Sequence, residues 1–411
     1  MKKNFSLLIA LFLCVGGYAQ TLDAFLSEVE RSNAAFLAEK YNVEIAEAQA
    51  VAAKVFNDPE FEAAYSDNQD RTLMMGRSVE LGLSYNVNLG NARKARIAVA
   101  NEEAEITKAL LEDYYRALRS EAITAWAEAW QARSLLELKR SSSESMDGIA
   151  HSDSLKAALG EIGKTDAMQS SIEARAMKGE LLQAEADYAN ALTVLSLLAG
   201  GMEFKDIVEG GVQLPPAELP VNELVAIAQN NRADLRAAFL SKSLSQKNLA
   251  LVKAQRAPDL GFNVGYSYNT EVRNEIAPAP LFRGVTVGIS IPLKLSSANK
   301  GERVAAEKAV LQADAAYEAA LQQIEAEVRT EYSSYLAAVK ASKHCSDEML
   351  ADARSILESR KSAYTQGDSS LLDYLLAVRV YNDTAESCIG AKAAVMASWA
   401  RLLAAVGVES L

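Results

Sequence analysis

Residues 79–89 read VELGLSYNVNL and residues 285–295 read VTVGISIPLKL, so nearly the same alternating segment occurs twice in the chain. Each copy follows a proline-led segment, PEFEAAY from Pro59 and PDLGFNVGYSY from Pro258. Long helical patterns flank both pairs of segments. We interpret the chain as a duplicated long helical hairpin, each copy interrupted by two strands, and this doubling favours a conduit.

The four segments predict strands near residues 59–67, 77–89, 258–270 and 283–295. Apolar and aromatic residues alternate with small or polar ones, which is typical of outer-membrane barrel strands with one face in lipid and one in water. For any single strand, a soluble sheet packed on a helix is the alternative. The residues expected to face lipid are Leu83, Val264, Tyr266 and Ile289.

Four strands are too few to close a transmembrane barrel by themselves. The smallest such barrels use about eight strands, and an open edge in lipid leaves backbone groups unpaired. The barrel must therefore be shared between chains. Three chains would supply twelve strands and two would supply a tight barrel of eight, and we favour the trimer.

Residues 1–19 are predicted to be a signal peptide, so the chain is expected to be exported. Lys2 and Lys3 are basic, an apolar run follows, and Ala19 is a small residue at the expected cleavage site. Acylation of Cys14 is the alternative. It is disfavoured because Leu13 stands where a small residue is expected.

The composition limits the classes of partner. Removal of Lys2 and Lys3 with the signal peptide takes the formal net charge from −12 to −14, which argues against nucleic acid or anionic lipid. No segment after the signal peptide offers the roughly 18 apolar residues of a transmembrane helix. Membrane crossing, if it occurs, is therefore expected to use strands.

The domain organisation follows the duplication. The first repeat is assigned to residues 20–200 and the second to residues 222–411. Residues 201–221 contain Gly-Gly and Pro-Pro pairs, so they are expected to form a linker. Helical patterns without proline run from about 91 to 140 and from about 297 to 364, which predicts helices of about 75 and 100 Å.

The last predicted helix carries two lines of mostly apolar residues. One line has alternating spacings of 4 and 3, as in a heptad seam, and the other has a period of 7. Two stripes imply two neighbouring helices, which is compatible with a closed cylinder and also with an antiparallel bundle. The first line is Leu371, Leu375, Val378, Asn382, Ala385, Ile389, Lys392, Met396, Trp399, Leu403 and Val406, and the second is Tyr374, Tyr381, Cys388, Val395 and Leu402.

Residues 363–381, AYTQGDSSLLDYLLAVRVY, are similar to the Tyr-x-x-Gly-x-x-x-x-x-Asp-x-Leu signature at the periplasmic tip of the TolC-type outer-membrane efflux family. Tyr364, Gly367, Asp373 and Leu375 fill that signature. The chain resembles this family over its whole mature length. The resemblance implies a mainly α fold with a small β part: a homotrimer with a twelve-stranded β-barrel on an α-helical barrel, docked on a periplasmic adaptor and an inner-membrane pump.

Within the family, the segment GISIPLKLSSANKGER with Pro292 looks most like the heavy-metal cation (cobalt-zinc-cadmium) branch. Three positions depart from the family pattern. Asn86 replaces the corresponding proline in the first repeat, Leu376 stands where some members carry a second gating aspartate, and Gln169 takes an acidic place after Gly163.

A gate is expected at the periplasmic tip. Gly163 and Gly367 are predicted to turn the chain in the left-handed conformation, and each precedes an arginine by twelve residues. Three-fold symmetry would place Asp373 in a ring of carboxylates facing the lumen, and Tyr364 would bond to a neighbouring helix. The alternative for Asp373 is a solvated helix residue. The predicted tip set is Gly163, Asp166, Tyr364, Gly367, Asp368 and Asp373.

The cysteines suggest a disulfide that no family signature requires. Cys345 lies 22 residues before Gly367 and Cys388 lies 21 after it, so the two fall at nearly the same height on antiparallel helices. An exported protein meets an oxidising compartment. A bridge and two buried thiols at unrelated azimuths are equally compatible with the sequence.

No motif in the sequence indicates an enzyme, a cofactor or a metal site. His151 and His344 lie far apart without partners at ligand spacing. The predicted function is a passive, gated exit duct for small molecules or metal cations in the outer membrane of a Gram-negative bacterium. The rivals are a periplasmic adaptor and a structural coiled-coil protein of the cell envelope.

Overall fold

The computed structural model describes residues 21–68, 74–207, 220–292 and 299–410. The predicted signal peptide and most of the predicted linker lie outside these residues. The chain divides into two compact units that cut across the two sequence repeats. The first, here the helical unit, comprises Met1–Glu39, Glu112–Arg232 and Gln322–Leu411, and the second, the sheet unit, comprises Lys40–Leu111 and Ala233–Leu321.

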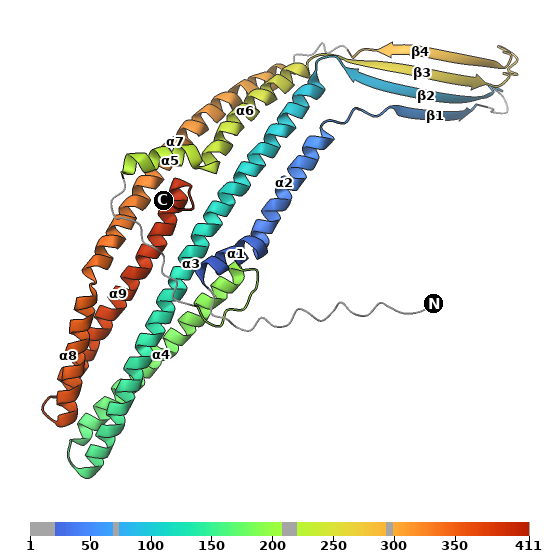
Figure 1. Cartoon of the computed structure of the whole chain (residues 1–411). Helices are drawn as coiled ribbons and strands as arrows, with labels where there is room; N and C mark the ends of the chain where they lie inside the picture. The colour runs from blue at the N-terminus through green and yellow to red at the C-terminus, as the bar shows by residue number, and fades with distance from the viewer. Residues whose placement is uncertain (1–20, 69–73, 208–219, 293–298, 411) are drawn as a thin grey trace, which may run out of the picture. The chain divides into compact units, whose positions relative to one another are not determined.

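The sheet unit contains one antiparallel sheet in the order β1-β2-β3-β4 (Figure 1). Its strands are β1 (Glu60–Asp67), β2 (Arg77–Asn88), β3 (Asp259–Asn269) and β4 (Phe282–Ser290). The central pairing of β2 with β3 joins the two sequence repeats.

The observed β4 is shorter than the strand predicted over residues 283–295. It ends at Ser290, so Ile291 and Pro292 lie outside the strand, and residues 293–295 are outside the described part of the chain. Proline has no backbone N–H to donate to a neighbouring strand, which accounts for an ending just before Pro292.

Helices α2 (Ala34–Ala52), α3 (Ala92–Leu159), α6 (Ala233–Ala254) and α7 (Asn299–His344) contribute segments to the sheet unit. Ala50 packs in a buried cluster with Ala100 and Ala104, and small residues of this kind let helices approach closely. Ion pairs also join these helices. Lys247 of α6 binds Glu102 of α3, and Lys242 of α6 binds Asp314 of α7.

The helical unit adds α1 (Leu22–Ser32), α4 (Lys164–Leu198), α5 (Val221–Asn231), α8 (Asp347–Gln366) and α9 (Leu371–Val406). Aromatic pairs form much of its core. Phe25 of α1 stacks on Trp126 of α3 with ring centroids 5.4 Å apart, and Tyr335 lies 5.2 Å from Trp399.

Two helix boundaries differ from the sequence prediction. The pattern predicted from residue 91 to 140 continues as α3 for 68 residues, about 100 Å of helix. The single helix predicted over residues 297–364 is wrong, because α7 ends at His344 and α8 begins at Asp347. Ser346 caps α8 by accepting a hydrogen bond from Met349 N–H at 3.1 Å. This cap satisfies a backbone N–H that the break leaves without a partner within the helix.

Helix α9 buries members of both predicted apolar lines. Val378, Trp399 and Val406 of the first line are buried, as are Tyr374 and Leu402 of the second. In the described part of the chain, α9 is also the one helix long and apolar enough to cross a membrane by composition alone, contrary to the expectation that no such segment exists. Half of its apolar window is buried in the structure.

Candidate functional site

One face of the sheet is apolar across all four strands. In the register, Phe61 pairs with Leu83, Leu83 with Val264, and Val264 with Val287, so the four side chains form one row. The neighbouring row contains Leu81, Tyr266 and Val285, and Ile289 pairs with Phe262. The four residues predicted to face lipid, Leu83, Val264, Tyr266 and Ile289, therefore share this face.

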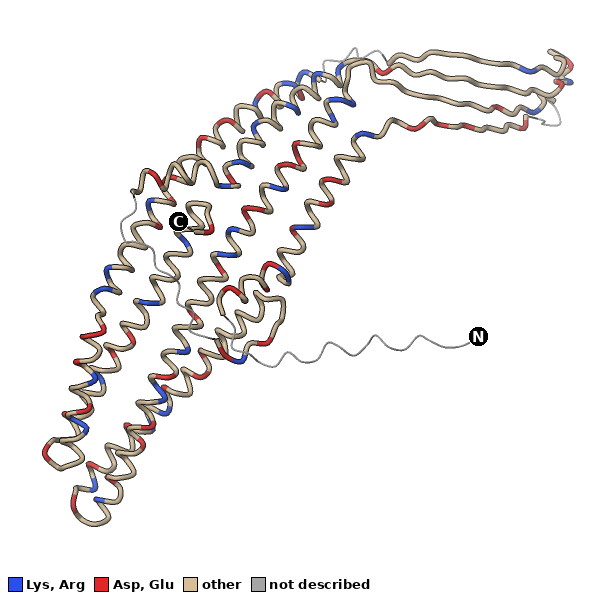
Figure 2. Tube along the Cα trace, in the orientation of Figure 1, with Lys and Arg blue, Asp and Glu red and all other residues tan. Residues whose placement is uncertain are grey.

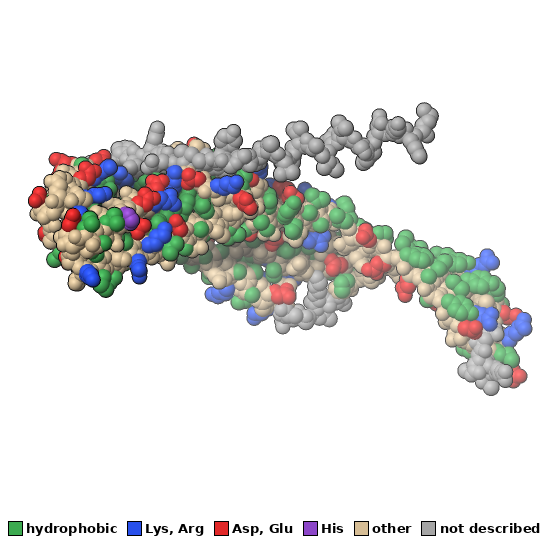
Figure 3. All heavy atoms as spheres, turned by 90° about the horizontal axis from the view of Figure 1, so that it is seen from below, with side chains coloured by type: hydrophobic (Ala, Val, Ile, Leu, Met, Phe, Trp, Pro, Cys, Tyr) green, Lys and Arg blue, Asp and Glu red, His purple; other side chains and the backbone are tan. Residues whose placement is uncertain are grey.

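These apolar side chains are exposed in the single chain. Val264 is 51% exposed and Val287 is 76% exposed. Figure 3 shows hydrophobic side chains gathered over the strands, and Figure 2 shows charged residues on β3 and β4 only near the strand ends. An apolar face of this extent marks a surface that contacts another apolar phase.

The opposite face carries small and polar side chains. One row consists of Glu62, Gly82, Gly265 and Thr286. A side chain added at Gly265 would meet its nearest neighbours at 3.7 Å and beyond, which is ordinary contact. This face therefore has room at Gly265.

A glycine in the left-handed conformation follows α3 and another follows α8, at the turns that lead into α4 and α9. Gly367 has φ 87° after α8, and Gly160 has φ 81° after α3. In both turns the next N–H bonds back five residues, Asp368 N–H to Ala363 O at 2.8 Å and Glu161 N–H to Lys156 O at 2.9 Å. Both turns are therefore Schellman motifs.

The prediction that Gly163 is left-handed is wrong. Its φ is −68°, and it precedes α4 as an extended N-terminal residue. Gly160 takes the left-handed position, because the end of α3 requires it three residues earlier. Asp166 lies in the first turn of α4, where a carboxylate favours the positive end of the helix dipole.

Tyr364 of α8 bonds to the neighbouring helix α3. Its hydroxyl donates to Asp153 Oδ2 at 2.8 Å, and Asp153 is only 1% exposed. The Tyr364 ring also stacks on Tyr374 of α9, with centroids 5.8 Å apart and planes 9° apart. Burial is the largest cause that raises the pKa of Tyr364, followed by the hydrogen bond to Asp153.

A second polar contact joins the same helices. Lys361 Nζ donates to Ser145 Oγ at 2.7 Å, and Ser145 Oγ lies 3.3 Å from the Tyr374 hydroxyl. We call Ser145, Asp153, Lys361, Tyr364 and Tyr374 the tip cluster. Sequence reasoning singled out Tyr364 but not Asp153, because Asp153 lies in another repeat and carries no local motif.

Asp373 has a local partner on its own helix. Ser370 Oγ accepts from Asp373 N–H at 3.2 Å, and Ser370 N–H donates to Asp373 Oδ2 at 3.4 Å, which together form a capping box. The hydrogen bond from Ser370 is the main cause that lowers the pKa of Asp373. Asp368 contributes a backbone bond to the turn.

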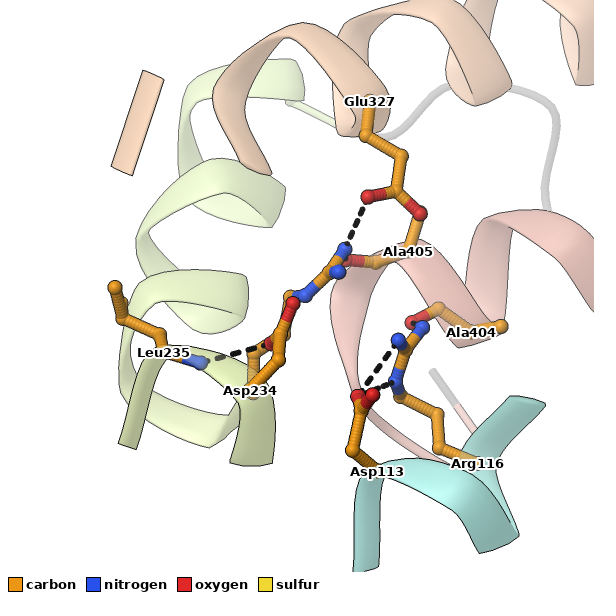
Figure 4. Close-up of polar contacts among 8 residues, drawn as sticks. Asp113, Arg116, Asp234, Leu235, Glu327, Ala404 and Ala405 are labelled. Atoms are coloured by element: carbon orange, nitrogen blue, oxygen red, sulfur yellow. Dashed lines mark hydrogen bonds and ion pairs between the residues drawn. The ribbon is translucent and has the colours of Figure 1, made fainter. Parts of the chain in front are cut away.

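Two arginines bind the carboxyl end of α9. Arg116 donates to Ala404 O at 2.6 Å and pairs with Asp113, and these residues face one another in Figure 4. Arg232 donates to Ala405 O at 3.0 Å and pairs with Glu327 at 2.8 Å. Cations at a helix carboxyl end satisfy its last carbonyls, so this cluster anchors α9.

The described residues include no group of three or more His, Cys, Asp or Glu side chains disposed to hold a metal ion. The candidate site consists of the exposed apolar sheet face and the tip cluster.

Residues 224–408 match the family model described as outer membrane efflux protein. A comparison with curated protein sequences found no match. This match covers most of the second predicted repeat, and for that part of the chain it confirms the resemblance seen in the sequence.

Solved channel structures share the fold over nearly the whole chain. CusC superposes with a TM-score of 0.74 at 17% identity, covering 99% of this chain and 97% of that one. CmeC of Campylobacter jejuni gives 0.76 at 14% identity, covering 98% and 94%. MtrE of Neisseria gonorrhoeae gives 0.73 at 17% identity, covering 94% and 89%. The chain has the mainly helical fold of these outer-membrane channels.

Proposed function

We propose that this protein is the outer-membrane channel of a tripartite efflux system, a passive and gated duct from the periplasm to the exterior. The observation that carries the proposal is the exposed apolar face that runs across β1, β2, β3 and β4 in register. Such a face needs lipid or another apolar surface, and the family match supports lipid of the outer membrane.

The sheet also supports assembly into a homotrimer. In this single chain β1 and β4 are the edge strands of a four-stranded sheet. An edge in lipid leaves its backbone groups unpaired, at a cost of several kcal/mol each, so each edge pairs with that of a neighbouring copy. Three copies supply a twelve-stranded barrel, and the long helices form the periplasmic tunnel.

The tip cluster is the proposed gate. The bond from Tyr364 to Asp153 ties α8 to α3, and the stacking on Tyr374 ties α8 to α9. An opening that separates these helices must break a hydrogen bond to a buried carboxylate. Opening would follow contact with a periplasmic adaptor and an inner-membrane pump, and the cargo would be a small molecule or a metal cation.

Planar-bilayer recording on the detergent-extracted full chain tests the function. The expected result is discrete conductance steps from a species that needs detergent for extraction from outer membranes. Release of the protein by osmotic shock without detergent, together with no conductance, would contradict the proposal and favour a periplasmic adaptor or a structural coiled coil.

A further inference from the structure

The two cysteines of the mature chain lie together in the helical unit. Cys345 is 9% exposed and Cys388 is 4% exposed. Both are free thiols in the structure, and Cys345 Sγ lies 3.9 Å from Oγ of Ser387, the residue next to Cys388. The sequence left open whether the two thiols face each other, and the contact with Ser387 brings the Cys345 side chain to the turn of α9 that carries Cys388.

Cys345 lies at a helix break that also contacts α9 through an ion pair. Cys345 occupies the short break between α7 and α8, immediately before the capping residue Ser346. Two residues further on, Asp347 pairs with Lys392 of α9 at 3.7 Å. The Asp347–Lys392 ion pair and the contact of Cys345 with Ser387 both join the break between α7 and α8 to the same part of α9.

We propose that Cys345 and Cys388 form an intramolecular disulfide in the exported protein. The bridge would tie the start of α8 to α9 and close a loop whose 42 intervening residues include the turn at Gly367. If the tip cluster moved, the bridge would still hold the start of α8 against α9. The inference rests on export of the chain, which is part of the proposed function.

The chemistry requires an external disulfide as oxidant, of the thiol-oxidase class found in oxidising compartments. The Cys345 thiolate attacks one sulfur of that disulfide, forms a mixed disulfide and releases the first oxidant thiolate. The Cys388 thiolate then attacks Cys345 Sγ and releases the second. Two thiols lose two protons and two electrons, and the oxidant becomes a dithiol.

Burial determines when the exchange can occur. Burial is the largest cause that raises the pKa of the free Cys388 thiol to about 11, and the neighbouring Cys345 thiol is the second. The Cys388 thiolate is therefore scarce at neutral pH in the folded hairpin. Oxidation is therefore fastest before α8 and α9 close on each other. Once formed, the buried bridge resists reductants that cannot enter the core.

The decisive experiment uses the full chain extracted from outer membranes. The protein is denatured without reductant, alkylated, digested and analysed by mass spectrometry. We expect a linked pair of peptides containing Cys345 and Cys388, lighter by two hydrogen atoms than the two free peptides, and no alkylated thiol. Two alkylated cysteines, or a dimer on a non-reducing gel, would overturn the inference.

Single variants Cys345→Ser and Cys388→Ser are the matched controls. Each should leave one alkylatable thiol and no covalent dimer. Reductant added with denaturant and then removed should lower the thermal midpoint of the wild-type protein by several degrees and leave the Cys345→Ser/Cys388→Ser variant unchanged. An equal shift in both proteins would count against a stabilising bridge.

Failure of export and failure of the bridge can be told apart. The same chain, made without residues 1–19 in a reducing compartment and refolded in detergent with oxidised glutathione, should form the linked peptide with near-complete yield. A linked peptide in this material but not in cells would refute the exported state and leave the geometry supported. Absence of the link in both would overturn the pairing itself.

Discussion

At the scale of single residues, the proposed gate depends on the contact between Tyr364 and Asp153. Asp153 is almost fully buried, and Tyr364 is its hydrogen-bond donor from α8. A hydrogen bond to a charged group contributes about 1.5–3 kcal/mol, and its loss leaves the carboxylate without that donor. The bond is therefore strong enough to shift an equilibrium between closed and open tips by more than tenfold.

Replacement Tyr364→Phe keeps the ring stack on Tyr374 and removes only the hydroxyl. We expect the channel conductance or open probability in planar bilayers to rise, because α8 is released from α3. Tyr41, which is exposed on α2, supplies the control Tyr41→Phe, with conductance as in the wild type. Identical recordings from Tyr364→Phe and the wild type would contradict the proposed gate.

The pH dependence of this bond follows from the raised pKa of Tyr364. A tyrosine with a raised folded-state pKa contributes stability that is fully present below its unfolded pKa of about 10 and is lost as the pH rises through the folded value. The difference in thermal midpoint between wild type and Tyr364→Phe should therefore be constant from about pH 6 to 9 and shrink only in stronger alkali. A difference that vanishes near neutrality would point to another titrating group.

Asp373 caps α9, and variants can separate this role from the proposed lumen-facing one. If three copies meet around the lumen, Asp373→Asn should abolish block by multivalent cations in bilayer recordings. Ser370→Ala removes the cap and keeps the carboxylate, so block should persist while the start of α9 weakens by about 1 kcal/mol. Persistent block in Asp373→Asn would leave Asp373 with its capping role alone.

Acid should weaken that cap in a definite window. The Ser370 hydrogen bonds lower the pKa of Asp373, so the stability they provide is present above the unfolded pKa of about 3.9 and is lost as the pH falls through the folded value. Near neutral pH the cap is intact.

At the scale of elements, the two helix turns depend on glycine at different places from those expected. Gly160→Ala and Gly367→Ala place a Cβ at positive φ, which costs about 1–2 kcal/mol each. Gly163→Ala should cost less, because its φ is negative and the only close neighbour is the flexible Asp166 side chain at 3.3 Å. Thermal unfolding of the three variants measures the difference, and equal losses at Gly163 and Gly160 would contradict the turn assignment.

The sheet offers a test of which face meets lipid. Val264→Arg puts a charge on the apolar face and should cost about 2–4 kcal/mol near the membrane midplane. Gly265→Arg, one residue along, puts the charge on the opposite face and meets only ordinary contacts at its Cβ, so it should be tolerated better. The readout is the fraction of protein assembled in the outer membrane. Equal damage at both positions would indicate a soluble core sheet.

At the scale of the whole molecule, the proposed trimer depends on β1 and β4 being the edge strands of the sheet. The 411-residue chain has a mass of 44.3 kDa. Light scattering in detergent should give a protein mass near three times that of one chain. A mass of two chains would instead imply the tight eight-stranded barrel. A monomer that keeps its channel activity would refute the shared barrel.

The sequence by itself determined the existence of the four strands and the two apolar lines of α9. These features depend on periods of 2 and 3.5 residues, which neighbouring side chains carry without help from distant parts of the chain. Tyr364 and Gly367 could also be identified from the sequence, because they lie three residues apart in one signature of the family that the chain resembles.

Only the tertiary structure decided which distant residues meet. Asp153 and Tyr364 come from separate repeats, and the break at Cys345 depends on a cap by Ser346 that competes with a continuous helical pattern. The left-handed glycine is Gly160 rather than Gly163, because the position at which α3 stops depends on the end of its packing and not on spacing along the chain. Contacts between segments more than 200 residues apart are decided by packing energy, which a local pattern does not contain.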